Sequence, residues 1–436
     1  MIMTRLIAFA IAIVGLLTAA GAFALADRAD ESGQAAMASL ARSTTASRIA
    51  KLEATVAAHP NDLEATTQLA SAYLVRARET GDPSFYTLAD TAVKRVLEKQ
   101  PDNVSALIVA GGLALSRHDF AGAMMLAERA RSIEPSVVAT YGVLTDANVE
   151  LGRYDEAIAA AQQMADLHPD FASLSRISYI RELHGDLGGA IESMRRAVDT
   201  GSLIPQDVVW GRTLLGNLYL TKGDIDGAAR QFDEASRLLP DDPAARAGQA
   251  RLAIIRGDLA SAETDLRAAI AQRPQPDSLI ALGDLLTTHG RTREADQQYA
   301  TVRAIQQLFV ANGGDADIEL ALFDADHGVD PQPTFEKARL AYERRQSVTA
   351  ADAVSWAAYK AGRIDDARAY SALAMRLGTR DAKFAYHAGV IAEAAGDLDS
   401  AKCYLRDAAV MAPSQSLLYV ASAREALDAV ASAAAR

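Results

Sequence analysis

Apolar runs that fit one face of an α-helix alternate along the chain with short turn sequences. Over residues 137–151 apolar side chains recur with a helical period, and the run stops at Gly152. A second amphipathic run begins after Tyr154 and ends at Pro169. Glycine accepts the positive φ that often follows a helix, and proline cannot continue one. The stretch 135–169 therefore predicts two antiparallel helices joined by a tight turn.

The same pattern recurs about every 34 residues. Pro101, Pro135 and Pro169 are separated by this interval, as are Pro240 and Pro274. Turn glycines recur at similar intervals, and an alanine follows each of them by five residues. These glycines are Gly152, Gly185, Gly223, Gly257, Gly290, Gly362 and Gly396. Self-similarity at such a period indicates a solenoid, in which each repeat packs on its neighbours.

The clearest copy of the motif lies at 215–240. It carries Leu215-Gly216, Tyr219, Gly223, Ala228, Phe232, Ala235 and Pro240 in this order. This pattern resembles the tetratricopeptide repeat (TPR) family, and about eight copies follow in phase over residues 61–413. The resemblance implies an all-α fold, a right-handed α-solenoid of about ten TPR-type helix-turn-helix repeats. In that family the first helix of each repeat lines the concave surface, where peptides bind.

The first 26 residues carry the pattern of a secretory signal peptide. Residues 6–17 are uninterruptedly apolar, and Ala24-Leu25-Ala26 provides an A-x-A cleavage site. Residues 6–26 are also long enough to span a bilayer, so a retained membrane anchor stays open, with a buried soluble helix as a third option. The flanking basic residues do not decide the orientation. We expect a periplasmic or extracytoplasmic solenoid, either soluble after cleavage at Ala26 or tethered to the inner membrane.

Irregular stretches divide the rest of the chain. Residues 27–46 are rich in Ala, Ser, Thr and Asp without a period, which predicts a flexible stalk. An N-terminal TPR array then covers 47–302, and a turn-rich junction at 303–331 breaks the period. Residues 332–436 form a C-terminal TPR array with a capping helix. Because a break changes the curvature of a solenoid, we expect two arms that meet at an angle.

Composition narrows the classes of partner and chemistry. A formal charge of −12 disfavours a nucleic-acid partner, which requires a basic stripe. Apolar residues make up 50% of the chain with only 6% aromatic, so close helix packing rests mainly on Ala and Leu. Cys403 is the only cysteine, which excludes an internal disulfide. We expect it to be a small buried side chain in the last repeat.

Motifs for catalysis or metal binding are missing or incomplete. The carboxylates at 324–330 are spaced like those of a calcium loop, but the glycine is misplaced and Phe335 stands where a bidentate Glu is needed. The seven histidines are too widely spaced for a metal set. Four of them precede a turn Gly or Pro, where a cation favours a helix C-terminus: His59, His168, His184 and His289. No hydrolase, metalloprotease or nucleotide-binding motif occurs, so we expect no enzyme and no cofactor.

The concave face remains as the candidate site. Projecting the inner positions of TPR proteins onto this register predicts a partner-binding groove. Its residues are Asp146, Trp210, Asn217, Arg251, Asp284, Trp356, Tyr359 and Tyr386. The aromatic members could instead fill gaps between repeats. The paired Lys and Asn clamp that grips a terminal carboxylate in chaperone-binding TPR domains is not found, which disfavours that class of partner.

The sequence thus predicts a non-enzymatic scaffold or adaptor that binds a protein or peptide in its groove outside the cytoplasm. It resembles TPR proteins of the bacterial envelope in general. The alternative is a membrane-anchored assembly factor or regulator that faces the cytoplasm, with membrane attachment through residues 6–26. An enzyme is the remote alternative. Nothing in the residues identifies the partner.

Overall fold

The computed structural model describes residues 45–201, 205–415 and 417–434. In these ranges 82% of the residues are helical and no β-strand occurs. The prediction of an all-α fold is therefore confirmed. The predicted signal or anchor at 1–26 and most of the stalk at 27–46 lie outside the described residues. No helix in the described ranges is long and apolar enough to cross a bilayer.

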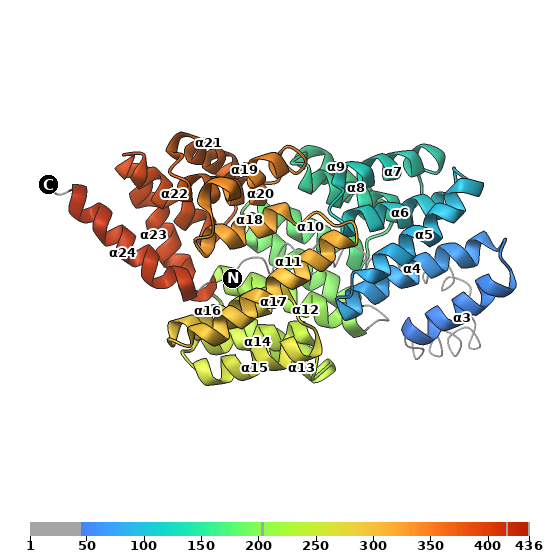
Figure 1. The fold of residues 1–436 in the computed structure, drawn as a ribbon, viewed down its shortest axis with the longest axis horizontal. Helices are drawn as coiled ribbons and strands as arrows, with labels where there is room; N and C mark the ends of the chain where they lie inside the picture. Colours follow the sequence, from blue (N-terminus) through green and yellow to red (C-terminus); the bar gives the residue numbers. More distant parts are fainter. Residues whose placement is uncertain (1–44, 202–204, 416, 435–436) are drawn as a thin grey trace.

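Ten antiparallel helix pairs follow one another in the described part of the chain (Figure 1), which confirms the expectation of about ten repeats. A single helix, α3 (Thr45–Ala58), precedes them, and α24 (Leu417–Ala434) follows. The pairs are α4 (Leu63–Thr80) with α5 (Ser84–Lys99), α6 (Val104–Ser116) with α7 (Phe120–Ile133), α8 (Val138–Glu150) with α9 (Tyr154–Leu167), α10 (Phe171–Leu183) with α11 (Leu187–Thr200), α12 (Pro205–Lys222) with α13 (Ile225–Leu238), α14 (Pro243–Ile255) with α15 (Leu259–Gln272), α16 (Pro276–Thr288) with α17 (Thr292–Ala311), α18 (Asp317–Asp326) with α19 (Pro331–Tyr342), α20 (Val348–Lys360) with α21 (Ile364–Met375), and α22 (Ala382–Ala394) with α23 (Leu398–Gln415).

The turn between α12 and α13 shows how the motif residues build one pair. Gly223 has a φ of 86°, a conformation that only glycine adopts without strain. The Asp224 side chain then accepts a hydrogen bond from the Gly227 N–H at 2.8 Å and caps α13. Ala228 and Phe232 are fully buried on the face of α13 that meets α12. The small alanine lets the two helices approach closely, so each motif residue has a local structural role.

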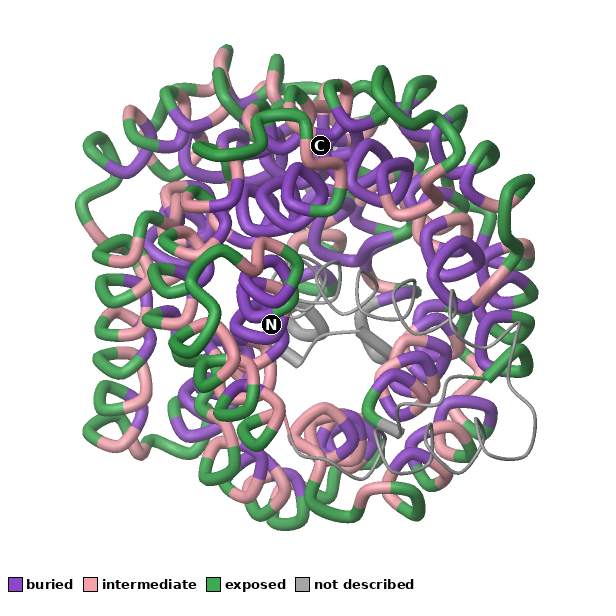
Figure 2. The backbone as a smooth tube through the Cα atoms, turned by 90° about the vertical axis from the view of Figure 1, so that its right-hand side faces the viewer, coloured by how far each residue is buried: buried purple, intermediate pink, exposed green. Residues whose placement is uncertain are grey.

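The pairs wind into a superhelix that brings residues about 195 positions apart into contact. Arg345 Nε donates to Glu150 Oε2 at 2.8 Å, the Val348 N–H donates to Tyr154 Oη at 2.8 Å, and Arg273 Nη1 donates to the Arg78 carbonyl at 2.8 Å. One superhelical turn therefore takes about 195 residues, and the second turn lies against the first. Figure 1 shows α18–α20 beside α8–α10, and the end-on view of Figure 2 shows a ring of helices with the exposed residues mainly on its outside. We call the contact between the two turns the seam. It joins residues 78–87, 117–120 and 150–185 of the first turn to residues 273, 309–319 and 345–384 of the second, and α12 also contacts α23.

The predicted junction at 303–331 holds the end of α17 and all of α18. We expected this break to set two arms at an angle. In the structure the loop after α17 instead packs against the turn between α6 and α7. The Asp315 N–H donates to the Arg117 carbonyl at 2.9 Å, and His118 Nδ1–H donates to the Asp315 carbonyl at 2.6 Å. The break in the period thus places the second superhelical turn on the first.

Cys403 corrects one expectation, because its side chain is exposed rather than buried. Ala401 and Leu405 of the same helix are fully buried. A residue two positions from each of them points to the opposite side of an α-helix, which has 3.6 residues per turn. The buried face of α23 therefore excludes Cys403.

Candidate functional site

The first helices of the pairs form the inner ring of the superhelix. Contacts link α4 to α6, α6 to α8, α8 to α10, α12 to α14, α18 to α20 and α20 to α22, so the first helices of these successive pairs touch one another directly. Figure 2 shows that the exposed residues lie mainly on the outside of the ring. The predicted groove residues all belong to first helices, and we describe them in chain order.

Asp146 on α8 is bonded to the next repeat. Arg176 of α10 donates from Nε to both carboxylate oxygens at 3.0 Å and from Nη2 to Oδ2 at 2.6 Å. Asp146 is 1% exposed and Arg176 2% exposed. Burial raises the pKa of Asp146 to about 6, although the charge of Arg176 opposes this rise. The pair joins neighbouring repeats, so little of the Asp146 carboxylate is available to a partner.

Asn217 and Arg251 form a second link between successive first helices. Arg251 Nη1 donates to Asn217 Oδ1 at 2.7 Å, and both side chains are half-buried. A hollow of about 30 Å³ lies beside Asn217, between α10 and α12, and is also lined by Ser175, Ser178, Tyr179 and Leu214. Trp210, on the same helix as Asn217, packs edge-on against Phe171 with ring centroids 5.7 Å apart. This part of the inner face keeps some accessible polar surface.

Asp284 on α16 is 7% exposed and hydrogen-bonded within the chain. The Tyr299 hydroxyl donates to Oδ1 at 2.9 Å, and His327 Nε2 lies 3.6 Å from the same oxygen. Burial lowers the pKa of His327, but the hydrogen bond to Asp284 raises it, and the net pKa is raised. Asp284 therefore joins α16 to α17 and to the end of α18.

Trp356, Tyr359 and Tyr386 come together on α20 and α22, and with His387 they form what we call the aromatic cluster. The Trp356 ring stacks on His387 at 4.0 Å and on Tyr359 at 5.1 Å, and Tyr386 lies 5.9 Å away. Trp356 Nε1 donates to Asp326 Oδ1 at 2.8 Å. Trp356 is only 4% exposed, whereas Tyr359 and Tyr386 are half-buried. Trp356 thus forms the buried part of the cluster, and the two tyrosines form its accessible surface.

Sequence reasoning missed a buried charged cluster next to these aromatic rings. His387 Nδ1 lies 3.0 Å from Asp352 Oδ1, and Lys383 Nζ lies 3.5 Å from Asp352 Oδ2. All three residues are at most 1% exposed. Burial raises the pKa of Asp352, but the charges of His387 and Lys383 outweigh it and lower the pKa. A signal did exist, because Asp352 and His387 are 35 residues apart, close to the repeat period.

A second missed cluster lies at the seam. The Arg345 guanidinium sits between two carboxylates, 2.8 Å from Glu150 Oε2 and 2.5 Å from Glu319 Oε1. The three side chains are 7%, 6% and 3% exposed, and the guanidinium carbon lies 5.2 Å from the centre of the Phe120 ring. Glu150 and Arg345 are 195 residues apart, so no repeat signal could connect them.

A cavity with a volume of about 570 Å³ opens at the seam. Four interhelical loops bound it, those of α6–α7, α8–α9, α17–α18 and α19–α20. Its charged lining residues are Arg117, Arg153, Arg344, Asp119, Asp315 and Glu343. Three cations face three carboxylates, so the lining favours neither an anionic nor a cationic ligand.

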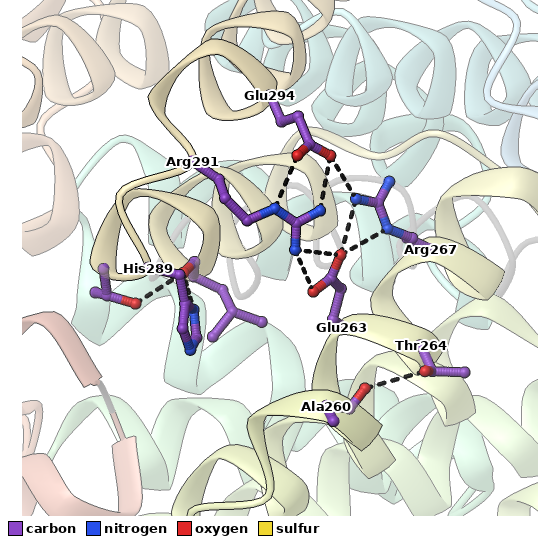
Figure 3. Close-up of polar contacts among 9 residues, drawn as sticks. Ala260, Glu263, Thr264, Arg267, His289, Arg291 and Glu294 are labelled. Carbon is purple, nitrogen blue, oxygen red and sulfur yellow. Dashed lines mark hydrogen bonds and ion pairs between the residues drawn. The ribbon is translucent and has the colours of Figure 1, made fainter.

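The outer face carries ion pairs and hydrogen bonds at helix ends. Figure 3 shows Arg291 bonded to Glu294 and to Glu263, with Arg267 bridging the same two carboxylates. His289 Nδ1–H donates to the Leu285 carbonyl at 2.8 Å. His184 bonds the Ile180 carbonyl in the same way, so the prediction that these histidines serve helix ends is confirmed for both. Among the described residues, no group of three His, Cys, Asp or Glu side chains could hold a metal ion.

The chain matches a family model described as tetratricopeptide repeat over residues 145–203 and 213–277. This part of the chain is built of tetratricopeptide repeats. No curated protein sequence matches the chain. Among solved structures, a TPR protein from Parabacteroides merdae is 15% identical over 56% of this chain and 99% of its own, with a TM-score of 0.41. The Thermus thermophilus TPR protein TTC0263 is 20% identical over 44% and 99%, with a TM-score of 0.39. Human IFIT1, solved as a dimer with m7Gppp-AAAA, is 15% identical over 76% of each chain, with a TM-score of 0.46.

The TPR fold mediates protein–protein interaction, so this chain has the architecture of an interaction scaffold. The matched residues cover α9, α10, α11, α13, α14 and α15 completely, together with parts of α8 and α12. They thus include two of the links between inner helices, Asp146 with Arg176 and Asn217 with Arg251. The aromatic cluster lies beyond the matched residues, and so does most of the lining of the seam cavity.

Proposed function

We propose that this TPR protein is a non-enzymatic adaptor that binds a protein or peptide segment against its inner helices, with the aromatic cluster as the main anchor. The exposure pattern within that cluster supports the proposal. Tyr359 and Tyr386 are half-buried and pack around Trp356, whose own position is fixed by His387 and Asp326. Aromatic side chains on a rigid base lose little conformational entropy on binding and often dominate interfaces.

The remaining predicted groove residues contribute unequally to this proposal. Asp146 and Asp284 are nearly inaccessible, and each accepts a hydrogen bond from within the chain. Asn217 and Arg251 are half-buried and lie by a small hollow, so they remain candidates for polar contacts. We therefore expect binding energy to concentrate on the two tyrosines, with the Asn217–Arg251 pair at the polar edge.

Affinity capture with tyrosine variants tests the anchor. The purified full chain, carrying either Tyr359→Ala with Tyr386→Ala or the control Tyr370→Ala, is used to capture proteins from the envelope fraction. Tyr370 is also half-buried but lies on α21 in the outer ring. Truncation of one anchor costs about 2 kcal/mol or more, equivalent to about 30-fold weaker binding. A partner retained equally by the wild type, the double variant and the Tyr370→Ala control contradicts the assignment of the anchor.

We further propose that the solenoid lies outside the cytoplasm. The signal-like pattern of residues 1–26 supports this location. Cell fractionation combined with protease treatment of spheroplasts separates the two possibilities. An extracytoplasmic solenoid is digested or released when the outer barrier is removed. A membrane-bound protein that stays protected in intact spheroplasts supports the alternative, an anchored assembly factor or regulator that faces the cytoplasm.

A further inference from the structure

Two turn glycines of the first superhelical turn touch the second turn. A Cβ added at Gly152 would lie 2.4 Å from the Gln346 carbonyl oxygen, and one at Gly185 would lie 2.5 Å from the Gly378 carbonyl oxygen. Added Cβ atoms at Gly257 and Gly362 would meet nothing within 4 Å. All four glycines have nearly the same φ, from 72° to 78°. All four glycines therefore meet the needs of their own turns, and only Gly152 and Gly185 also contact the second superhelical turn.

Polar contacts across the seam are made mostly by loops and helix ends. The Thr379 hydroxyl donates to the Leu183 carbonyl at 2.5 Å, and Tyr154 Oη accepts from the Val348 N–H at 2.8 Å. Arg345, in the loop between α19 and α20, contributes the buried ion cluster with Glu150 and Glu319. These contacts can separate without breaking any helical hydrogen bond.

The apolar part of the seam is small compared with the contacts inside a repeat. Val348 and Phe384 from the second turn join a core cluster with Val149, Tyr154 and Leu183 of the first. Within one turn, by contrast, consecutive pairs share continuous cores of buried side chains, such as the cluster that extends from α6 to α12. Repeats of a solenoid are stabilised by their nearest neighbours. The seam is an additional contact, and no helix pair depends on it to stay folded.

We propose that the seam is a latch, at which the two superhelical turns separate while the helix pairs stay folded, giving a bound segment lateral access to the inner helices. The buried charges favour such a contact, because Arg345 and its two carboxylates all regain hydration when the seam opens. Desolvation offsets most of the stability that a buried ion cluster provides, so opening it to water costs little. Opening of apolar cores between neighbouring repeats is not compensated in this way.

Paired glycine variants test the latch without any partner. Gly152→Ala with Gly185→Ala places methyl groups against the second turn, whereas Gly257→Ala with Gly362→Ala adds the same backbone strain with no contact. We expect the first pair to raise the radius of gyration in small-angle X-ray scattering, with circular dichroism matching the control pair. Hydrogen exchange should increase in loops at 345–348 and 378–381. Equal scattering for the two pairs, with helicity kept in both, overturns the proposal.

A milder variant keeps the test valid if the methyl groups prevent folding. Tyr154→Phe with Thr379→Val removes two hydrogen bonds across the seam without adding bulk. Its control, Tyr370→Phe with Thr264→Val, removes hydroxyls from outer helices, where Thr264 bonds only the Ala260 carbonyl of its own helix (Figure 3). Faster exchange at the seam in the first pair alone supports the latch, and identical exchange in both pairs overturns it.

Lateral access is measured by the chemical reactivity of an inner residue. In a Cys403→Ser background, Leu183→Cys places a thiol on α10, at a position that is 5% exposed and shares a core cluster with Phe384 of the second turn. Its labelling by a maleimide should be faster in the seam variants than in their controls, in proportion to the open fraction. An unchanged rate in an expanded chain overturns the access claim. The claim of access rests on the proposed function, but these readouts do not, so a failed partner capture leaves the latch result independent.

Discussion

Replacing Arg345 by methionine tests the seam at its most buried charge. In the folded chain the guanidinium lies between Glu150 and Glu319, and all three side chains are at most 7% exposed. Methionine keeps apolar length beside Phe120 but leaves two buried carboxylates without their cation. Removing one partner of a buried ion pair costs about 3–5 kcal/mol. We expect a loss of that size at pH 7 in urea unfolding followed by circular dichroism.

The pKa of Glu319 determines how the stability difference between wild type and variant changes with pH. Burial raises the pKa of Glu319, but the charges of Arg345 and His118 outweigh it, so the pKa is lowered in the folded chain. A carboxyl with a lowered folded pKa contributes stability above its unfolded pKa of about 4.3 and loses it as the pH falls through the folded value. In Arg345→Met the effect of burial is no longer opposed by Arg345, and protonation relieves the penalty. The difference between wild type and variant should therefore shrink between pH 7 and about pH 5.

Two further variants separate charge burial from general damage. Arg291→Met removes an exposed arginine from the outer network, and exposed pairs contribute little, so only a small change is expected. Adding Glu150→Gln and Glu319→Gln to Arg345→Met should restore much of the lost stability, because no unpaired charge remains. If Arg345→Met unfolds no more easily than Arg291→Met, or if its defect grows as the pH falls, the reasoning is refuted.

Three other predictions concern the packing, the inner face and the N-terminus. Ala157→Leu should destabilise by roughly 1–3 kcal/mol in chemical denaturation, because Ala157 is fully buried between paired helices, whereas Ala159→Leu on the exposed face should not. Burial raises the pKa of Asp277 to about 7, so stability falls as the pH rises from about 4 to 7. Asp277→Asn should then stabilise by roughly 1–4 kcal/mol at pH 8 and have little effect near pH 4 in the same assay. Bulky residues at both alanines of Ala24-Leu25-Ala26 should trap the full-length chain in the membrane, and N-terminal sequencing of the wild type checks the cleavage.

The repeats could be predicted from the sequence because their signals are local. In the pair α12–α13, Gly223 has a positive φ, Asp224 caps α13 and Ala228 is buried. All three roles act within residues 223–228. The same five-residue spacing from glycine to alanine therefore places each pair in register. The exposure of the Cys403 side chain was not predicted, because an error of one position in the register changes which face of a helix a residue occupies.

The inner face could be predicted only in part. Projection onto the family register located first-helix residues, but it could not show whether a side chain bonds its neighbour. Asp146 shows the difficulty, since its partner Arg176 lies 30 residues away instead of 34 and so escapes a search at the strict period. Trp356 shows a second difficulty. An aromatic residue at an inner position can be buried beneath an accessible surface without being part of that surface. The predicted groove therefore needs the binding test described above.

The seam depends on the irregular stretches as well as on the turns of regular repeats. The last turn of α4 contributes the Arg78 carbonyl, which accepts a hydrogen bond from Arg273. The break after α17 supplies Asp315, whose backbone bonds both Arg117 and His118. A uniform array has no reason to place such loops against one another at about 195-residue separation. The loop that breaks the period after α17 thus helps to hold one superhelical turn on the other. For this reason departures from a repeat are the positions at which to look for contacts that the repeat itself cannot encode.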